Sequence, residues 1–270
     1  MNKIFSDEQS QYIKDNYLIK SYKEIAEELG FTERQIRGKV TTMGLKKLRT
    51  INSDYFSKID SPIKAYFLGF LYADGWVIYN EATRNYEMGM QLQSCDKYIL
   101  EKLNEELGNK NIIHHLNPKD KIIDGIKTTS GHSDVLRVYS KQLVLDLIHH
   151  GVETNKTQKE VFPIVDDSLF FDFLRGYIDG DGCFYVNKNN NVTCHITCSS
   201  QVPLLYLQEK LLNYNIYTCI HQEKERKYKL ICYNKNSINN LVNRLYYEDG
   251  LFCLSRKYEK ISFLLNGSAA

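Results

Sequence analysis

Two carboxylates and two glycines follow an apolar run in the segment FLRGYIDGDGCFYV, residues 173–186. Asp179 and Asp181 could hold a calcium ion, shape a turn or act as catalytic carboxylates. A calcium loop of the EF-hand type would need an oxygen ligand two residues before Asp179 and a glutamate at its twelfth position. Tyr177 and Lys188 stand there instead, which excludes this loop. A plain turn and a carboxylate at a helix end both remain open.

The same pattern occurs earlier, in YFLGFLYADGWVIY at residues 66–79. Small residues four positions apart lie on one helix face and let two helix backbones approach closely. Two such helices would bring their final carboxylates together at their C-terminal ends, where the carboxylates oppose the helix dipole and repel each other. A divalent cation would remove both problems, so the arrangement favours a metal site over a turn. The matched pairs are Gly69 with Gly176, Ala73 with Gly180, and Asp74 with Asp181.

The repetition extends over units of about 100 residues, since 94–109 corresponds to 199–215 and 138–147 to 232–241. Each unit reads as helix, two strands, helix, two strands, helix. Period-two alternation in 86–94 and 191–199 predicts strands with one buried face and one polar face. Ordinary solvation is the alternative explanation of such a polar face. In the first unit, Met88, Met90 and Leu92 are expected to be buried and Glu87, Gln91 and Gln93 to be polar-facing.

Composition sets broader limits. The 270 residues are 43% hydrophobic and 25% charged, as in ordinary soluble proteins. No apolar run reaches the roughly 18 residues of a membrane span, and the polar N-terminus does not resemble a signal peptide. We therefore expect a cytoplasmic, nucleoid-associated protein without a membrane partner. The seven cysteines are scattered and are expected to be free thiols. Cys194 and Cys198 alternate along a strand, which disfavours a zinc site with His195.

Net charge is only +2, but residues 51–167 carry −4 and the segments on either side each carry +3. A nucleic-acid partner would therefore need a locally basic face.

The segments FLGFLYADG (67–75) and LRGYIDGDG (174–182) resemble the two signature helices of single-chain LAGLIDADG homing endonucleases. The resemblance covers roughly residues 60–265. It implies an α+β fold of two pseudo-twofold αββαββα repeats that form a saddle on double-stranded DNA. It also implies that Asp74 and Asp181 bind the metal, that Mg²⁺ is the usual ion, and that Mn²⁺ can replace it. Tyr72 departs from the motif's earlier acid in the first copy, whereas Asp179 retains it.

Phosphodiester hydrolysis needs an activated water and a neutralised phosphate, which Mg²⁺ held by carboxylates, carbonyls and waters can supply. The carbonyls of Ala73 and Gly180, at the helix ends, are candidate additional metal ligands. Lys141 and Lys235 follow the last strand of each repeat and are assigned to phosphate charge stabilisation or water polarisation. A solvated lysine at a helix N-terminus is the alternative for each of them.

DNA contacts are expected from two further groups of residues. Lys156 and Lys257 match each other in the third helical region of the repeats and are candidate phosphate anchors. Base readout is expected from the polar strand faces. The candidates there are Gln91, Gln93, Arg137, Thr193, His195 and Thr197.

Residues 4–46 predict a small all-α domain. Ser6 is expected to cap a first helix, and Thr32 with Gln35 three positions on forms a capping-box pattern. The spacing resembles the helix-turn-helix class of DNA-binding domains, although helical hairpins with basic residues are common. The expected core is Ile25, Ala26, Leu29, Ile36 and Val40. The residues that could enter a major groove are Arg34, Gln35, Arg37 and Lys39, with Thr41 and Thr42.

The predicted organisation is a helix-turn-helix domain at 1–46, a linker at 47–62, LAGLIDADG repeats at 63–155 and 156–265, and a disordered tail at 266–270. The predicted function is that of a monomeric, site-specific double-stranded DNA endonuclease of the homing type. One alternative is a non-cleaving transcription regulator of the same fold, against which the retention of both aspartates argues. The other is an RNA maturase that binds its host intron.

Overall fold

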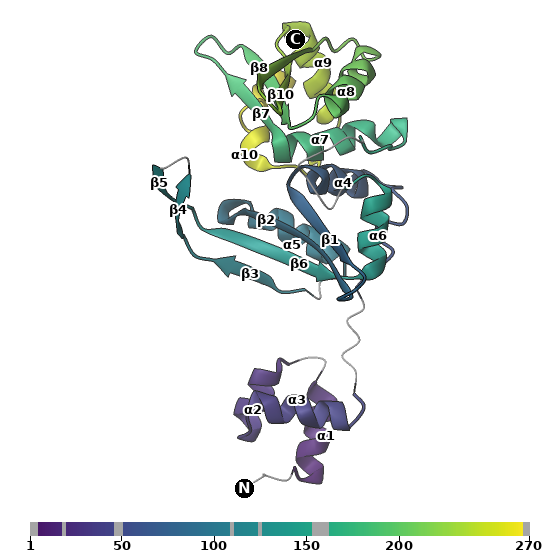
Figure 1. The fold of residues 1–270 in the computed structure, drawn as a ribbon, viewed down its shortest axis with the longest axis vertical. Helices are drawn as coiled ribbons and strands as arrows, with labels where there is room; N and C mark the ends of the chain where they lie inside the picture. Colours follow the sequence, from purple (N-terminus) through teal and green to yellow (C-terminus); the bar gives the residue numbers. More distant parts are fainter. Residues whose placement is uncertain are drawn as a thin grey trace. The chain divides into compact units, whose positions relative to one another are not determined.

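The computed structural model describes residues 5–17, 20–45, 51–108, 111–123, 126–152 and 162–266 (Figure 1). The chain divides into two compact units, Met1–Thr50 and Ile51–Ala270. Among the described residues, no helix has the length and apolar character needed to cross a bilayer. All seven cysteines are free, as predicted.

The N-terminal unit consists of α1 (Asp7–Asn16), α2 (Tyr22–Leu29) and α3 (Glu33–Thr42). Capping boxes begin all three helices, and those at Ser6 and Thr32 confirm the helix starts predicted there. Gly30 ends α2 in the left-handed region, with φ of 70°, which glycine adopts without strain. The predicted core is confirmed except that Leu29 is only partly buried, and Ile13 of α1 joins it.

The larger unit begins with the first αββαββα repeat, in which β1, β2, β6 and β3 form an antiparallel sheet in the order β1-β2-β6-β3. An additional hairpin, β4–β5, lies between β3 and β6 and was not predicted. The elements are α4 (Pro62–Asp74), β1 (Gly75–Asn80), β2 (Asn85–Gln93), η1 (Ser94–Asp96), α5 (Lys97–Glu106), β3 (Ile113–Leu116), β4 (Asp120–Ile123), β5 (Ile126–Thr129), β6 (Ser133–Tyr139) and α6 (Lys141–His149).

The second repeat has the same topology, with its sheet in the order β7-β8-β10-β9. Strand register also repeats, since Trp76 pairs with Gly89 in the first sheet and Cys183 pairs with His195 in the second. The α+β fold of two repeats is therefore confirmed. The elements are η3 (Asp167–Leu169), α7 (Phe170–Asp181), β7 (Gly182–Val186), β8 (Val192–Cys198), α8 (Val202–Leu212), β9 (Cys219–Lys224), β10 (Lys227–Cys232), α9 (Lys235–Leu245), α10 (Ser255–Tyr258) and α11 (Phe263–Asn266).

Burial follows the predicted alternation along β2 and β8. Met88, Met90 and Leu92 are buried, and β8 alternates between buried and half-buried residues along its whole length. On the polar face, Glu87 is nevertheless buried, with only 6% exposure. Trp76 on the neighbouring strand donates an indole N–H to its carboxylate over 3.0 Å, which accounts for the burial.

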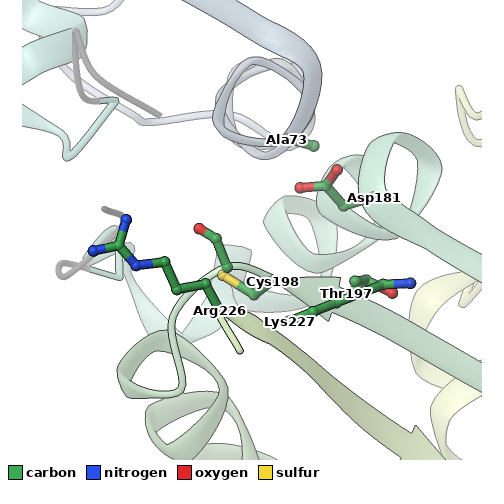
Figure 2. Close-up of a pocket in the computed structure, with 7 residues that line it drawn as sticks. Ala73, Asp181, Thr197, Cys198, Arg226 and Lys227 are labelled. Atoms are coloured by element: carbon green, nitrogen blue, oxygen red, sulfur yellow. The ribbon is translucent and has the colours of Figure 1, made fainter. Parts of the chain in front are cut away.

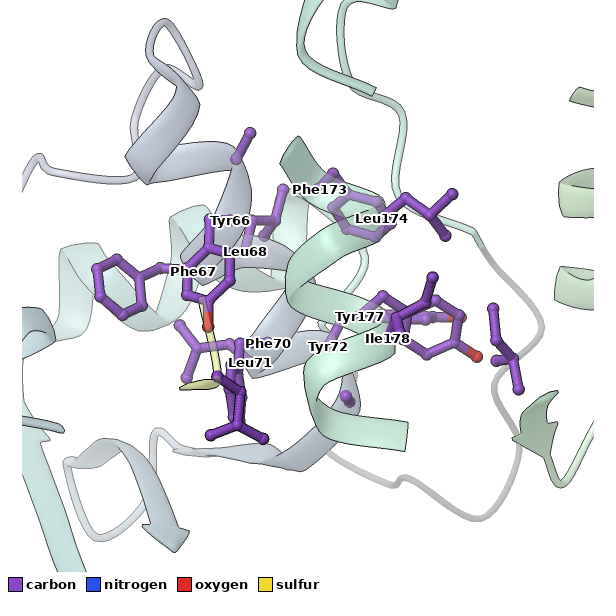
Figure 3. Close-up of a cluster of buried hydrophobic side chains, with 14 of the residues drawn as sticks. Tyr66, Phe67, Leu68, Phe70, Leu71, Tyr72, Phe173, Leu174, Tyr177 and Ile178 are labelled. Carbon is purple, nitrogen blue, oxygen red and sulfur yellow. The ribbon is translucent and has the colours of Figure 1, made fainter. Parts of the chain in front are cut away.

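Helices α4 and α7 pack against each other at the centre of the unit, with one sheet belonging to each side (Figure 1). A Cβ added to Gly69 would lie 2.0 Å from the Phe173 carbonyl oxygen, and one on Gly176 would lie 1.9 Å from the Tyr66 carbonyl oxygen. Only glycine fits at this separation, because real Cβ atoms do not approach backbone so closely. Aromatic and aliphatic side chains surround the pair (Figure 3).

The linker predicted at 47–62 extends too far, because Tyr55 and Phe56 are 4% and 0% exposed and belong to the core of the larger unit. The boundary predicted between the repeats, at residues 155 and 156, falls outside the described residues. Lys156 and most of the predicted tail lie outside them as well.

Candidate active site at the ends of two helices

Asp74 and Asp181 are the last residues of α4 and α7, and the packing of these helices brings both ends to one place. The contacts progress in the same direction on both helices, because Tyr66 meets Gly176 and Ala73 meets Gly180. The helices therefore run parallel, and their C-termini coincide. A Cβ on Gly180 would lie 3.3 Å from the Asp74 carboxylate, so the Asp74 side chain reaches the backbone directly before Asp181.

A cavity of about 360 Å³ opens at this junction (Figure 2). Asp181 and Ala73 line it from the two helix ends, and the end of β8 lines it with Thr197 and Cys198, followed by Ser199. Two cationic residues also line it, Arg226 from the turn between β9 and β10 and Lys227 from the first position of β10. Arg226 and Lys227 were not predicted to lie here, because nothing in the strand pattern places this hairpin beside Asp181.

The C-terminal end of α7 is neutralised by a buried ammonium group. Lys257, in α10, is 6% exposed, and its Nζ donates to the carbonyls of Ile178, Asp179 and Gly182 over 2.8, 2.6 and 2.6 Å. A fourth, longer contact of 3.3 Å reaches the Gly180 carbonyl. A cation at this position complements the negative end of the helix dipole.

This position corrects the expectation that Lys257 anchors a DNA phosphate. Its charge is already used by backbone carbonyls and is shielded from an exposed DNA strand. Burial lowers its pKa, while the neighbouring Asp179 and Asp74 act in the opposite direction. Lys257 is thus a cation held just behind the candidate site. The matched residue of the first repeat, Lys156, lies outside the described residues.

Asp179, the earlier acid of the motif, is buried away from the cavity at 2% exposure. Its carboxylate accepts hydrogen bonds from the Tyr66 hydroxyl of α4, over 2.9 Å, and from the Leu254 N–H, over 2.7 Å. Desolvation raises its pKa to about 6, against the opposing effects of these hydrogen bonds and of Lys257. Asp179 therefore connects α7 to α4 and to the segment that delivers Lys257.

Lys141 and Lys235 lie too far from the two aspartates for the roles assigned to them. The Lys141 ammonium bonds Glu81 over 3.0 Å, directly after the last residue of β1, whereas Asp74 precedes its first residue. Six residues of strand separate these ends by about 20 Å. Lys235 lines a different cavity with the β7–β8 turn residues Asn189, Asn190 and Asn191, at the opposite end of β7 from Asp181.

The polar face of the first sheet holds Gln91, Gln93 and Arg137 in exposed positions, as predicted. Gln91 donates to the Ser133 hydroxyl over 2.9 Å. Arg137 has half of its side chain exposed, and its Nε lies 3.8 Å from Glu87. Trp76 lies over Gly89, where an added Cβ would come within 2.2 Å of the indole ring. Trp76 thus holds Glu87, and Glu87 lies beside Arg137. The sequence placed Glu87 on the polar face, but neither this contact nor Trp76 was predicted.

Thr193, His195 and Thr197 are half-buried along the polar side of β8. The Thr193 hydroxyl and His195 Nε2 are 3.1 Å apart. Burial lowers the pKa of His195, and the nearby Lys229 acts in the same direction. Lys229 and Lys227 both pair with Glu223 of β9, and these hydrogen bonds lower the pKa of Glu223 to about 2.

The residues predicted to enter a major groove lie on α3 of the N-terminal unit. Arg37 pairs with Glu33 over 2.8 Å, and the Lys39 ammonium lies 5.5 Å from the centre of the Phe5 ring. Arg34 is exposed. The Gln35 side chain is committed to the capping box, where its oxygen accepts from the Thr32 N–H over 2.9 Å. This commitment argues against base contacts by Gln35.

Residues 170–245 match the family model of the LAGLIDADG-like domain. The sequence has no match among curated proteins. Among solved structures, a mutant of I-SmaMI matches with a TM-score of 0.50 and 12% identity, over 77% of this chain and 92% of that chain. The LAGLIDADG homing endonuclease I-GzeII, in complex with its DNA target, matches with a TM-score of 0.50 and 12% identity, over 78% and 92%. I-DmoI, in complex with DNA and Ca, gives a TM-score of 0.45 and 17% identity, over 73% and 92%.

Residues 170–245 thus form a LAGLIDADG-like domain, and the larger unit has the fold of the LAGLIDADG homing endonucleases. The resemblance seen in the two nine-residue motifs is confirmed, and it includes the paired helices that carry them.

Proposed function

We propose that the protein is a site-specific DNA endonuclease that hydrolyses both strands of a duplex with a divalent cation, Mg²⁺ or Mn²⁺, held by Asp74 and Asp181. The observation that carries the proposal is the meeting of these two residues at the coincident ends of α4 and α7. Two carboxylates at two helix C-termini are electrostatically unfavourable unless a cation joins them. I-GzeII, which shares the fold, is described in complex with its DNA target.

The residues at the site fit a hard cation. Mg²⁺ is usually bound by one or two carboxylates, with substrate phosphates and waters completing its shell. Within the described residues no group of three His, Cys, Asp or Glu side chains could hold a metal, so the protein would supply the two aspartates and backbone oxygens. The Ala73 and Gly180 carbonyls are the candidate backbone ligands. Gly180 has one long bond from Lys257, which leaves a lone pair for a second partner.

Each part of the site has a separate task in hydrolysis. A bound cation would lower the pKa of a water and stabilise charge on the phosphate. Asp74 and Asp181 would fix it between the two strands, because each belongs to a different repeat. Lys257 would compensate the helix dipole of α7 and so keep the Asp181 end of the site from becoming too negative for DNA to approach. The polar faces of the two sheets would read base edges in the groove.

The N-terminal unit would add affinity on flanking DNA through Arg34, Arg37 and Lys39 of α3. Tethered modules raise the apparent affinity through effective concentration, so removal of residues 1–50 should weaken binding by about ten- to a thousandfold. The cut positions should stay the same in a footprinting and cleavage experiment on one long substrate. A shifted cut would show that the N-terminal unit selects the site. We further propose that the protein acts as a monomer, since one chain supplies both aspartates, and that it is cytoplasmic.

The decisive test compares Asp74→Asn and Asp181→Asn with a control, Asp249→Asn, in the exposed turn after α9. Asparagine keeps the shape but not the charge, so each site variant should lower the rate of double-strand cleavage by orders of magnitude and leave DNA binding nearly unchanged. A duplex selected by the wild-type protein from a randomised library serves as substrate, with Mg²⁺ or Mn²⁺. Full cleavage by the double variant would refute the metal assignment. A wild-type protein that binds but never cuts would instead identify a regulator of the same fold.

A further inference from the structure

The turn between β9 and β10 presents an arginine in a backbone conformation that disfavours it. Lys224 pairs with Lys227, so Glu225 and Arg226 form a two-residue turn. Arg226 has a φ of 57°, in the left-handed region. Glycine, asparagine and aspartate are the residues that such turns favour. An arginine here costs stability that glycine would not, and strain of this kind concentrates at functional sites.

The location of this turn supplies a function. Arg226 lines the same cavity as Asp181 and Ala73, and its side chain borders the space into which the Asp181 carboxylate points (Figure 2). The neighbouring Lys227 is paired with Glu223 over 2.9 Å. Among the described residues, no side chain forms an ion pair or a hydrogen bond with the Arg226 guanidinium. A cation with no side-chain partner in the part of the chain that the structure describes therefore borders a cavity of about 360 Å³, which is large enough for a phosphodiester.

We propose that Arg226 binds a backbone phosphate of DNA at the Asp181 side of the site and positions the scissile strand there. The inference rests on the proposed endonuclease function and adds a positioning residue to it. A guanidinium suits this task because its donors can form two parallel bonds to phosphate oxygens. The turn geometry explains why the strained conformation is retained: a residue at this place in a tight turn lies at the rim of the cavity rather than on a strand face.

The chain contains its own matched control. Arg84 has a φ of 52° in the turn between β1 and β2 and is exposed like Arg226. That turn follows β1 at the opposite end from Asp74. Arg84 therefore shares the charge and the strain of Arg226 without the proximity to the catalytic aspartates.

The experiment compares Arg226→Gly, Arg226→Lys and Arg84→Gly with the wild-type protein. Both glycine variants should keep or increase the melting temperature, because glycine adopts positive φ without strain. Affinity is measured in EDTA, where hydrolysis cannot proceed, on a duplex that the wild-type protein selects and cuts from a randomised library. The logarithm of the DNA-binding constant falls linearly with the logarithm of the salt concentration, and Arg226→Gly should make this slope shallower by about 0.9, the value for one phosphate contact. At saturating DNA with Mg²⁺ it should slow single-turnover cleavage at least about tenfold.

Arg226→Lys should restore the salt slope, since the charge is kept, and part of the rate. If Arg226→Gly and Arg84→Gly give the same slope and the same rate as the wild-type protein, the inference is wrong while the proposed function stands. If the wild-type protein neither binds nor cuts any duplex of the library, both the proposed function and this inference fail.

Discussion

Helices α4 and α7 occupy equivalent places in the two repeats, but different interactions hold them in the core. In α7 the residues Asp172, Arg175 and Asp179 are buried and charged. The equivalent residues of α4 are Ala65, Leu68 and Tyr72, which are buried in an apolar environment. The backbone contacts at Gly69 and Gly176 are nearly the same. The close approach of the two backbones thus requires glycine on both helices. The other three buried positions differ in polarity between the repeats.

The charged residues of α7 connect this helix to the C-terminal segment. The Arg175 guanidinium donates to Asp172 over 2.7 Å, to the Leu245 carbonyl over 2.8 Å and to the Phe252 carbonyl over 3.1 Å. Together with Asp179, these bonds fix the path that brings Lys257 to the end of the helix. The second repeat therefore uses buried polar bonds to position a chain segment, where the first uses aromatic packing of Tyr72 against Phe173 and Phe162.

The largest effect is expected from breaking the buried ion pair. Arg175→Leu alone leaves the Asp172 carboxylate buried without its cation, and Asp172→Ala alone leaves the guanidinium, so each should destabilise the fold by about 3–5 kcal/mol. The double variant carries the residues of α4 at both positions and should recover a large part of this loss. Urea unfolding of the four proteins measures the coupling. If the losses of unfolding free energy in the two single variants add up to the loss in the double variant, Arg175 and Asp172 do not stabilise the fold as an interacting pair.

Addition of a methyl group at the helix crossing tests the symmetric part of the comparison. Gly69→Ala and Gly176→Ala should each cost about 3 kcal/mol, because the new Cβ meets backbone that cannot give way. Gly131→Ala serves as the control, since nothing lies within 4 Å of a Cβ there. Urea unfolding should show equal losses of unfolding free energy for Gly69→Ala and Gly176→Ala. A loss at only one site would mean that the two helices do not share the close contact.

Protonation of Asp179 should make stability depend on pH. Its pKa of about 6 in the folded state exceeds the ordinary value of 3.8, so between these pH values the native state binds a proton that the unfolded chain has lost. Stability then falls as pH rises from about 4 to 6, by about 2–3 kcal/mol relative to Asp179→Asn. The groups that face this carboxylate are Tyr66, Arg175, Tyr246, Cys253 and Lys257.

This pH dependence is checked by measuring the free energy of unfolding of the wild type and of Asp179→Asn at several pH values. Tyr72→Phe, at the equivalent position of α4, is the control and should parallel the wild type, since a phenol does not titrate in this range. A constant difference between the wild type and Asp179→Asn would contradict the raised pKa.

The smallest effect is expected on the sheet faces, which also differ between the repeats. Trp76, Gly89 and Arg137 are cross-strand neighbours in the first sheet, where the second has Cys183, His195 and Ile231. Glu87→Gln should loosen Arg137 and lower the discrimination at one base pair of the target by about 1 kcal/mol, less than the 1–3 kcal/mol expected for Arg137→Ala. Selection of preferred targets from a library by each variant measures this. Unchanged preference at every base pair with Arg137→Ala would remove Arg137 from the reading surface.

The sequence by itself determined the repeat, the two motif helices and the alternation of the strands. These features depend on residues near one another in the chain: glycines four apart, apolar residues two apart, and a Thr–Gln pair that caps α3. The sequence therefore also indicated that Asp74 and Asp181 form a pair. Each aspartate follows the same spacing of small residues at the end of its helix.

Only the tertiary structure decided which cations accompany these aspartates. Lys141 and Lys235 match each other in sequence, but the length of a strand places each at the wrong end of its sheet. Arg226, 45 residues after Asp181, comes to the cavity because β9 and β10 run antiparallel beside β8. Lys257 comes to the end of α7 because buried polar bonds fix the path of the C-terminal segment. Such positions depend on contacts between residues far apart in the chain, which local spacing does not encode.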